Sequence, residues 1–279
     1  MNLSPGEIER AIDAALAEDL GSGDVTTRAT IPADTRLSLV MSTREAIVLA
    51  GIDIAAVVFR RLAPDAKIDI HVRDGERARP GQTLARVEGP AGALLSAERT
   101  ALNFVQVLSG IATLTRSYVE RIEGTRAVLL DTRKTLPGLR ALSKYATRMG
   151  GATNHRLRLD DGILIKDNHI AVAGSVAEAV RRAKAANTGL KDVRVECDTL
   201  EQMQQALAAG ADSILADNMT PAALREVVRI AAGRVPIEAS GGVTLENIRV
   251  IAETGVDYIS TGKITQAAPA VDIGLDIAE

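Results

Sequence analysis

The segment from Leu130 to Ile170 concentrates basic side chains, and it also holds two of the chain's three histidines. Its basic residues are Arg133, Lys134, Arg140, Lys144, Arg148, Arg156, Arg158 and Lys166. The chain as a whole is slightly acidic, with a formal net charge of −3. Arg can hold a carboxylate or phosphate through two parallel hydrogen bonds, and Lys supplies a compact positive charge. The segment therefore predicts a pocket for a ligand that carries several negative charges.

Five of the residues in this segment stand at or between the ends of two apolar runs that read as strands. They are Arg133, Lys134, His155, Arg156 and Lys166. The first two follow the run 127–131, and the last one ends "ILIK" within the run 162–167. By contrast, Arg140, Lys144 and Arg148 recur every four residues, which places them on one face of a helix. A solvated basic face explains that spacing at least as well as the rim of a pocket.

Acidic residues end two later apolar runs. Glu196 closes "VRVE" and Asp217 closes "SILAD". Two carboxylates at strand ends could hold Mg²⁺ or accept hydrogen bonds from sugar hydroxyls. A ligand with phosphates and a ribose would use both the bases and the acids.

Glycines follow the last two runs. "SGG", Ser240–Gly242, comes directly after one predicted strand and before "TLENI", which is expected to begin a helix, and Gly262 follows the next strand. Glycine lets the backbone approach a ligand closely, and its exposed N–H groups can bind phosphate. Each glycine alone is explained by an ordinary turn, but two such sites on successive terminal strands favour phosphate binding.

Three further reactive side chains have simpler interpretations. His169 is expected to cap the segment that follows it. Cys197 neighbours Glu196, which disfavours a thiolate, and strand alternation turns it to the opposite face, so it is expected to pack in the core. His71 has no companion residues and is expected to be superficial or structural.

The elements that must position these residues form a repeating pattern. Short, nearly continuous apolar runs occur at 127–131, 162–167, 193–198, 212–217, 235–240 and 256–262, with helical patterns between the last four. Such repeats predict buried parallel strands in α/β units. Because functional residue types cluster at the carboxyl ends of successive runs, an α/β barrel is favoured. An open α/β sheet remains the alternative, although no G-x-G-x-x-G follows an early strand.

The amino-terminal part has a different rhythm. Residues 7–20 have helical spacing, and Gly21 and Gly23 end that helix. Residues 36–90 read as short strands and turns, with turn signals at Asp74-Gly75 and Pro80-Gly81. A long helical pattern then opens at Ser96, and a break is expected within "LSGIATL".

Composition excludes several classes of protein. Only 2% of residues are aromatic and none is Trp, so the core must be aliphatic. The near-neutral charge balance and the few aromatics argue against a nucleic-acid binder. A single cysteine permits no intrachain disulfide, and the acidic start does not resemble a signal peptide. We expect a cytoplasmic protein without a membrane anchor.

Several blocks of this chain resemble the quinolinate phosphoribosyltransferase family, in the same order and over nearly the whole length. They are "EDLGSGDVTT", "ERTALNFVQVLSGIATLT", "LDTRKTLPGLR", "GGATNHR", "LIKDNHI", "VECDTLEQ", "ILADNM", "IEASGGVTLENI" and "YISTG". The resemblance implies an α/β fold with an amino-terminal α/β sandwich domain, residues 1–112, and an incomplete (β/α) barrel, residues 113–268. The tail, 269–279, is expected to pack back on the first domain.

The resemblance also implies an activity and a set of site residues. The activity is transfer of a phosphoribosyl group from phosphoribosyl pyrophosphate to quinolinate, with loss of pyrophosphate and CO₂, in NAD biosynthesis. Residues implied to bind quinolinate are Arg133, His155, Arg156 and Lys166, together with Arg99 from the other subunit of a homodimer. The residues implied to be catalytic are Lys134, which faces the anionic substrates, Lys166, Glu196 and Asp217. Glu196 and Asp217 are implied to serve the ribose hydroxyls and Mg²⁺ of phosphoribosyl pyrophosphate, and its 5′-phosphate is implied to be held by Ser240, Gly241, Gly242 and Gly262.

The chain departs from the family pattern at three positions. Ala152 stands where a third glycine is usual, and Arg158 stands where a small residue is common. Gln266 replaces a histidine often found near the phosphate, which puts one phosphate contact in doubt. None of the three removes a residue assigned to the central chemistry.

Other functions remain open at this level. A Schiff-base aldolase acting on a phosphorylated sugar would use Lys166 or Lys263, but it leaves the "TRK" and "NHR" blocks unexplained. A regulatory anion-binding protein and a phosphoribosyltransferase with another acceptor are further alternatives.

Overall fold

The structure, a computed structural model, describes residues 4–186, 189–190 and 192–278. The chain forms two compact units. The first comprises Met1–Arg116, Thr135–Gly151 and Thr265–Glu279, and the second comprises Ser117–Lys134 and Ala152–Ile264. This division differs from a single boundary near residue 112, because residues 135–151 also belong to the first unit.

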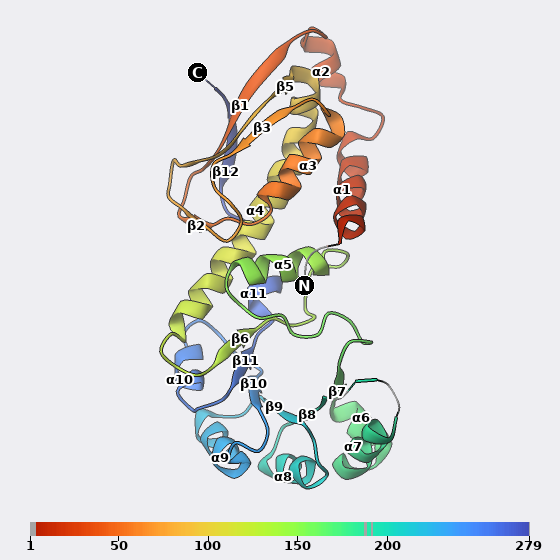
Figure 1. Cartoon of the computed structure of the whole chain (residues 1–279), viewed down its shortest axis with the longest axis vertical. Coiled ribbons are helices and arrows are strands. Elements are labelled where there is room, and N and C mark those ends of the chain that lie inside the picture. Colours follow the sequence, from red (N-terminus) through yellow and green to blue (C-terminus); the bar gives the residue numbers. More distant parts are fainter. Residues whose placement is uncertain (1–3, 187–188, 191, 279) are drawn as a thin grey trace. The chain divides into compact units, whose positions relative to one another are not determined.

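The first unit is built on a four-stranded sheet with the strand order β12-β1-β5-β3 (Figure 1). Its strands are β1 (Arg36–Thr43), β3 (Lys67–Ile70), β5 (Thr83–Pro90) and β12 (Ile273–Ile277). Neighbouring strands are antiparallel, and β12 brings the end of the chain alongside β1, where Met41 pairs with Leu275. A separate two-stranded sheet joins β2 (Ile47–Val48) to β4 (Arg77–Ala78).

The helices of this unit supply most of its aliphatic core. They are α1 (Pro5–Leu20), α2 (Val25–Thr30), α3 (Ile52–Leu62), α5 (Arg140–Met149) and the long α4 (Ala91–Arg121), which enters the second unit after Arg116. The prediction that residues 36–90 contain only strands and turns is wrong, because α3 lies within them. Its N–H groups at Gly51 and Ile52 are capped by the carboxylate of Asp74, a contact from a distant segment that local spacing does not reveal.

The expected break in the long helix is absent. α4 runs without interruption from Ala91 to Arg121, and it starts five residues before Ser96. Ser96 does not cap the helix, because its hydroxyl donates to the carboxylate of Asp24. Gly110 is instead required by packing: a Cβ there would overlap the carbonyl oxygen of Pro269 and lie 3.2 Å from the Cα of Ala270. The glycine admits the carboxyl-terminal segment against the helix.

The second unit contains a six-stranded parallel sheet with the order β6-β11-β10-β9-β8-β7. Its strands are β6 (Val128–Leu130), β7 (Ile163–Ile165), β8 (Val193–Cys197), β9 (Ser213–Asp217), β10 (Ile237–Ser240) and β11 (Tyr258–Ser260). Each of the six predicted apolar runs contains one of them. Because β6 follows β11 in the sheet and no pairing of β6 with β7 joins the described strands, the barrel is incomplete. The predicted fold class is confirmed.

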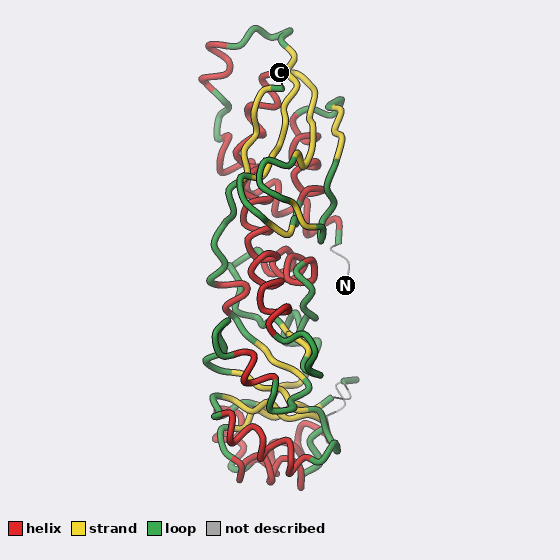
Figure 2. Tube along the Cα trace, turned by 90° about the vertical axis from the view of Figure 1, so that its left-hand side faces the viewer, coloured by secondary structure: helices red, strands yellow, loops and turns green. Residues whose placement is uncertain are grey.

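Helices cover the outside of this sheet. They are α6 (Asp167–Ala173), α7 (Val176–Ala185), α8 (Leu200–Ala208), α9 (Pro221–Ala231) and α10 (Ile248–Ala252), and α11 (Lys263–Gln266) follows β11. Figure 2 shows the red helices of this unit on the outer side of its yellow strands. On β8, buried Val193, Val195 and Cys197 alternate with Arg194 and Glu196. Alternation therefore aims charged side chains at the face opposite the helices.

Candidate functional site

The sheet gathers most of the predicted site residues at one edge. The residues at the carboxyl ends of its strands are Arg133 and Lys134 after β6, Lys166 after β7, Glu196 on β8, Asp217 on β9, Ser240 on β10 and Gly262 after β11. All six strands are parallel, so their carboxyl ends lie at the same edge. Register places Ser240 directly beside Asp217.

A buried carboxylate fixes the loop that carries His155 and Arg156. Asp131, directly after β6, is fully buried, and its carboxylate accepts from the Asn154 amide (2.6 Å) and from the His155 backbone N–H (2.8 Å). Thr153 adds a parallel bridge to Leu130. Sequence analysis did not assign a role to Asp131. Its signal was an acid that directly continues an apolar run.

His155 points into a buried ion pair that sequence analysis also missed. The Nε2 atom of its ring lies 2.8 Å from Nη1 of Arg194 and 3.5 Å from Oε2 of Glu238, and these two side chains pair with each other. The Nδ1 atom accepts from the backbone N–H of Arg156 at 2.7 Å. Both ring nitrogens therefore face protein groups. The missed signal was a charged residue inside each of two apolar strands.

Burial is the largest influence on Glu238 and raises the pKa of its carboxyl. The hydrogen bond and charge of His155 and the charge of Arg194 outweigh burial, so the pKa lies below its ordinary value. Arg194 also donates to the Ser213 hydroxyl at 3.0 Å. The floor of the barrel is thus a compensated set of charges.

Arg133 and Arg156 form a pair of like charges. Burial lowers the pKa of the Arg156 guanidinium, and the positive charge of Arg133 lowers it further. Arg156 donates to the Gly162 carbonyl at 2.8 Å. The Nε of Arg133 is buried and has no hydrogen-bond partner among the described residues. Two neighbouring guanidinium groups carry the same charge, so together they are suited to binding a dianion.

Glu196 and Asp217 each contact a polar side chain of a neighbouring residue. Lys166 Nζ pairs with Glu196 Oε2, and the charge of Glu196 also acts on Arg156. The amide of Asn218 donates to Asp217 Oδ2 at 2.6 Å. Among the described residues, no cluster of three His, Cys, Asp or Glu side chains is arranged to hold a metal.

The glycines lie where the sequence placed them. Gly241 and Gly242 have positive φ angles of 84° and 60°, and the Asn247 amide donates to the Gly242 carbonyl at 2.9 Å. The next helix begins at Ile248 and not at Thr244, so the loop is longer than expected. A Cβ on Gly262 would lie 2.9 Å from Lys134 Cδ, so the Lys134 side chain passes over this glycine.

Other residues singled out from the sequence have the following environments. His169 Nδ1 accepts the Lys166 N–H at 3.0 Å, in agreement with a capping role. Cys197 is fully buried, which raises the pKa of its thiol to about 12. His71 is partly exposed beside Asp69. Lys144 is 3% exposed, so the solvated-face interpretation fails for it.

The three residues that depart from the family pattern, and the predicted site residue Arg99, lie in the following places. Arg158 is exposed and pairs with Asp160. Arg99 lies on α4, and Gln266 on α11; both belong to the first unit and are exposed. Ala152, in the second unit, is buried.

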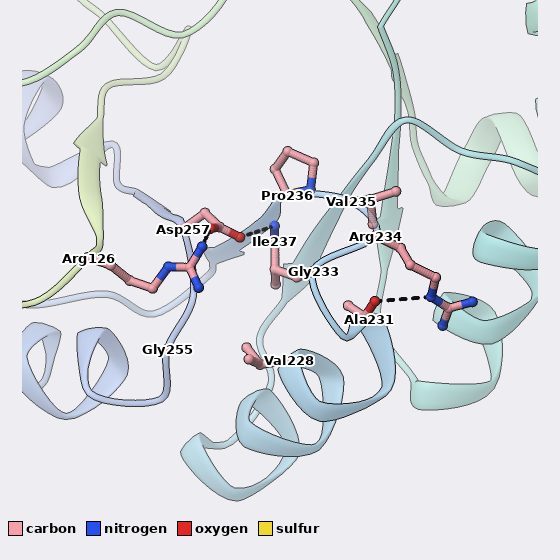
Figure 3. Close-up of a pocket in the computed structure, with 10 residues that line it drawn as sticks. All are labelled: Arg126, Val228, Ala231, Gly233, Arg234, Val235, Pro236, Ile237, Gly255 and Asp257. Atoms are coloured by element: carbon pink, nitrogen blue, oxygen red, sulfur yellow. Dashed lines mark hydrogen bonds and ion pairs between the residues drawn. The ribbon is translucent and has the colours of Figure 1, made fainter.

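A pocket of about 180 Å³ lies at the opposite ends of the strands (Figure 3). It is lined in part by Ile237, which begins β10, and by Asp257, which precedes β11. Asp257 pairs with Arg126 and accepts the Ile237 N–H, while Arg234 donates to the Ala231 carbonyl at the end of α9. These contacts close a helix end and a strand start, so the pocket is structural.

An incomplete parallel α/β barrel with cations, acids and glycine loops at one edge is typical of α/β-barrel proteins that bind phosphorylated ligands. Residues 24–109 match the family described as quinolinate phosphoribosyl transferase, N-terminal domain, and residues 111–276 match its C-terminal domain. The chain belongs to the quinolinate phosphoribosyltransferase family.

Individual relatives agree. The chain is 46% identical over 284 residues to a nicotinate-nucleotide pyrophosphorylase (carboxylating) of Mycobacterium leprae, covering 99% of this chain and 100% of that protein. It is 41% identical to a probable enzyme of the same name from Bacillus subtilis, over 97% of this chain and 93% of that protein. The crystal structure of nicotinate-nucleotide pyrophosphorylase from Ehrlichia chaffeensis has 42% identity and a TM-score of 0.94, with 100% of both chains covered.

Proposed function

We propose that this chain transfers the phosphoribosyl group of phosphoribosyl pyrophosphate to the ring nitrogen of quinolinate. The products are nicotinate mononucleotide, pyrophosphate and CO₂, which makes the chain a carboxylating nicotinate-nucleotide pyrophosphorylase in NAD biosynthesis. Family membership over both domains supports this activity. The cations near the strand ends also suit anionic substrates.

One observation carries the choice of a dicarboxylate acceptor. Burial and the positive charge of Arg133 lower the pKa of Arg156, and Arg133 Nε is buried without a partner among the described residues. Two carboxylates on adjacent ring carbons would neutralise both guanidinium groups through paired hydrogen bonds. Lys166 would contribute a third positive charge, and the loop held by Asp131 keeps Arg156 in place.

The acids fit Mg²⁺ bound together with substrate. Mg²⁺ is commonly held by one or two carboxylates plus substrate phosphates and water, so Glu196 and Asp217 suffice without a third protein ligand. Asn218 donates to Asp217 Oδ2, and Oδ1 would bind a cation or a ribose hydroxyl. When bound, Mg²⁺ would neutralise charge on the departing pyrophosphate.

The protein's part in the reaction is binding and orientation. Glu196 and Asp217 would orient the ribose hydroxyls, while Ser240, Gly241, Gly242 and Gly262 would hold the 5′-phosphate. Lys134, packed over Gly262, would stabilise charge that develops on pyrophosphate. Once the ring nitrogen is joined to ribose it is cationic, and that charge stabilises the carbanion left as the neighbouring carboxylate departs. No protein nucleophile is needed.

A homodimer with a shared site is the accompanying proposal. The exposed Arg99 would enter the partner's quinolinate site. Mixing inactive Arg99→Ala subunits with inactive Arg156→Ala subunits should restore activity, because some sites in the mixed dimer would contain both arginines. Absence of any rescue from a mixture shown to exchange subunits would contradict the shared site.

The activity itself is tested with purified protein, quinolinate, phosphoribosyl pyrophosphate and Mg²⁺. We expect equal amounts of nicotinate mononucleotide and CO₂, and loss of turnover when Mg²⁺ is chelated. A folded preparation that makes no nicotinate mononucleotide would refute the proposal. Nicotinate and other pyridine or pyrimidine carboxylates serve as competing acceptors.

The cytoplasmic location expected from the sequence is likewise a proposal, which cell fractionation would test. Among the helices that the structure describes, none has the length and apolar character needed to cross a bilayer.

A further inference from the structure

Asn218 has an unusual backbone conformation at the end of β9. Its φ angle is 52°, and among the described residues only Ala232 is another non-glycine with positive φ. Such conformations cost free energy for residues with a Cβ, although Asn tolerates them better than most. A strained residue that directly follows Asp217 indicates that the position is constrained by its surroundings.

Asn218 contacts two parts of the site at once. Its side-chain amide donates to Asp217 Oδ2 at 2.6 Å, and its backbone N–H donates to the Ser240 carbonyl at 2.9 Å. A Cβ built on Gly241 would lie 2.5 Å from Asn218 Cγ and 2.7 Å from its backbone nitrogen. The carboxamide therefore rests directly on the backbone of the glycine loop.

We propose that Asn218 is a positioning residue that fixes the carboxylate of Asp217 relative to the N–H groups of the Ser240–Gly242 loop. The proposal rests on the proposed function, in which Asp217 serves the ribose and Mg²⁺ and the loop holds the 5′-phosphate. Asn218 thus sets the spacing between the two parts of the site that bind phosphoribosyl pyrophosphate. Quinolinate would be bound by Arg133, Arg156 and Lys166, so its affinity should not depend on this spacing.

The residue type follows from three requirements. The position needs a side chain that tolerates positive φ, a donor for Asp217, and a flat group that stacks on Gly241. Glycine meets only the first requirement. Aspartate matches the shape but cannot donate when ionised, and it would repel Asp217. Asparagine meets all three.

Two variants and a matched control separate positioning from strain. Asn218→Gly relieves the backbone and removes the amide, and Asn218→Asp keeps the shape and removes the donor. The control, Ala232→Gly, relieves the same kind of backbone strain at the end of α9, where no site residue lies. Thermal melting confirms that each variant is folded.

We expect both Asn218 variants to raise KM for phosphoribosyl pyrophosphate by about tenfold or more, as loss of a hydrogen bond to a charged group does. KM for quinolinate should change by less than about threefold on the same scale, and Ala232→Gly should leave both values unchanged. Calorimetric titration of phosphoribosyl pyrophosphate with Mg²⁺ should show the same loss of affinity.

Other outcomes have defined meanings. An active wild-type protein whose Asn218 variants keep both KM values, or raise them equally, would overturn the positioning role and leave the proposed function intact. If the wild type neither binds phosphoribosyl pyrophosphate nor turns over, the proposed function fails and the positioning role fails with it. Should Asn218→Gly not fold, the isosteric Asn218→Asp decides alone.

Discussion

The buried Arg194–Glu238 pair offers a quantitative test of how the barrel interior is held together. The Glu238 side chain is 2% exposed and that of Arg194 is 16% exposed. Glu238→Gln keeps the volume of the side chain and removes the charge. Arg194 would then remain as a largely buried cation whose remaining carboxylate contact is the longer one, 3.6 Å, to the exposed Asp192.

Removal of one member of a buried ion pair costs about 3–5 kcal/mol, because the remaining charge is left uncompensated. Arg194 is partly hydrated and keeps its contact with Ser213 and a longer one with Asp192. We therefore expect the lower end of the range, about 3 kcal/mol. Arg194→Met should cost a similar amount, since Glu238 would lose its closest cation and keep the longer contact with His155. The double variant Arg194→Met/Glu238→Leu should cost no more than either single change, because neither charge remains.

The assay is urea unfolding followed by circular dichroism at 222 nm, which suits a chain without Trp. Wild type, both single variants and the double variant form a double-mutant cycle, in which the interaction energy equals the departure from additivity. A single change that costs less than about 1 kcal/mol would refute the reasoning, since that is typical of an exposed pair. A double variant that loses the full sum of the two single changes would refute it as well.

Four further results are expected. Arg156→Ala should raise KM for quinolinate by about 10–100-fold, since a charge-assisted contact is lost, and should leave the melting temperature nearly unchanged; an unaltered KM would contradict its role. The depressed pKa of Glu238 stabilises the fold above the ordinary value of 4.5, and that stability should disappear as the pH falls below 4.5 through the folded pKa; the Glu238→Gln variant should lack this part of the acid-unfolding profile. Cys197, with a pKa of about 12, should resist a thiol reagent at pH 8 until urea unfolds the protein, whereas rapid modification of native protein would show it accessible. Gly110→Ala should destabilise the first unit by more than about 1 kcal/mol, because a Cβ would overlap the Pro269 carbonyl; an unchanged melting curve would show that the segment shifts freely.

Much of this protein was determined by local patterns in the sequence. Six apolar runs predicted the strands of the barrel because a strand buried on both faces must be apolar along its length. Their end residues predicted which charged residues and glycines share one edge of the sheet, because parallel strands bring their carboxyl ends together. Motif resemblance added the family and the substrates, which the matched domains bear out.

Tertiary structure decided the rest, because the deciding contacts join residues far apart in the chain. Gly110 was expected to break the long helix, but the helix continues and the glycine makes room for Pro269. The sequence did not predict α3, because the carboxylate that caps it comes from Asp74, in a distant turn. Arg194 and Glu238, charged residues inside apolar strands, became interpretable only when the sheet brought them together beneath His155. Periodicity reports which face of an element is buried, but the partner buried against it is set by the fold.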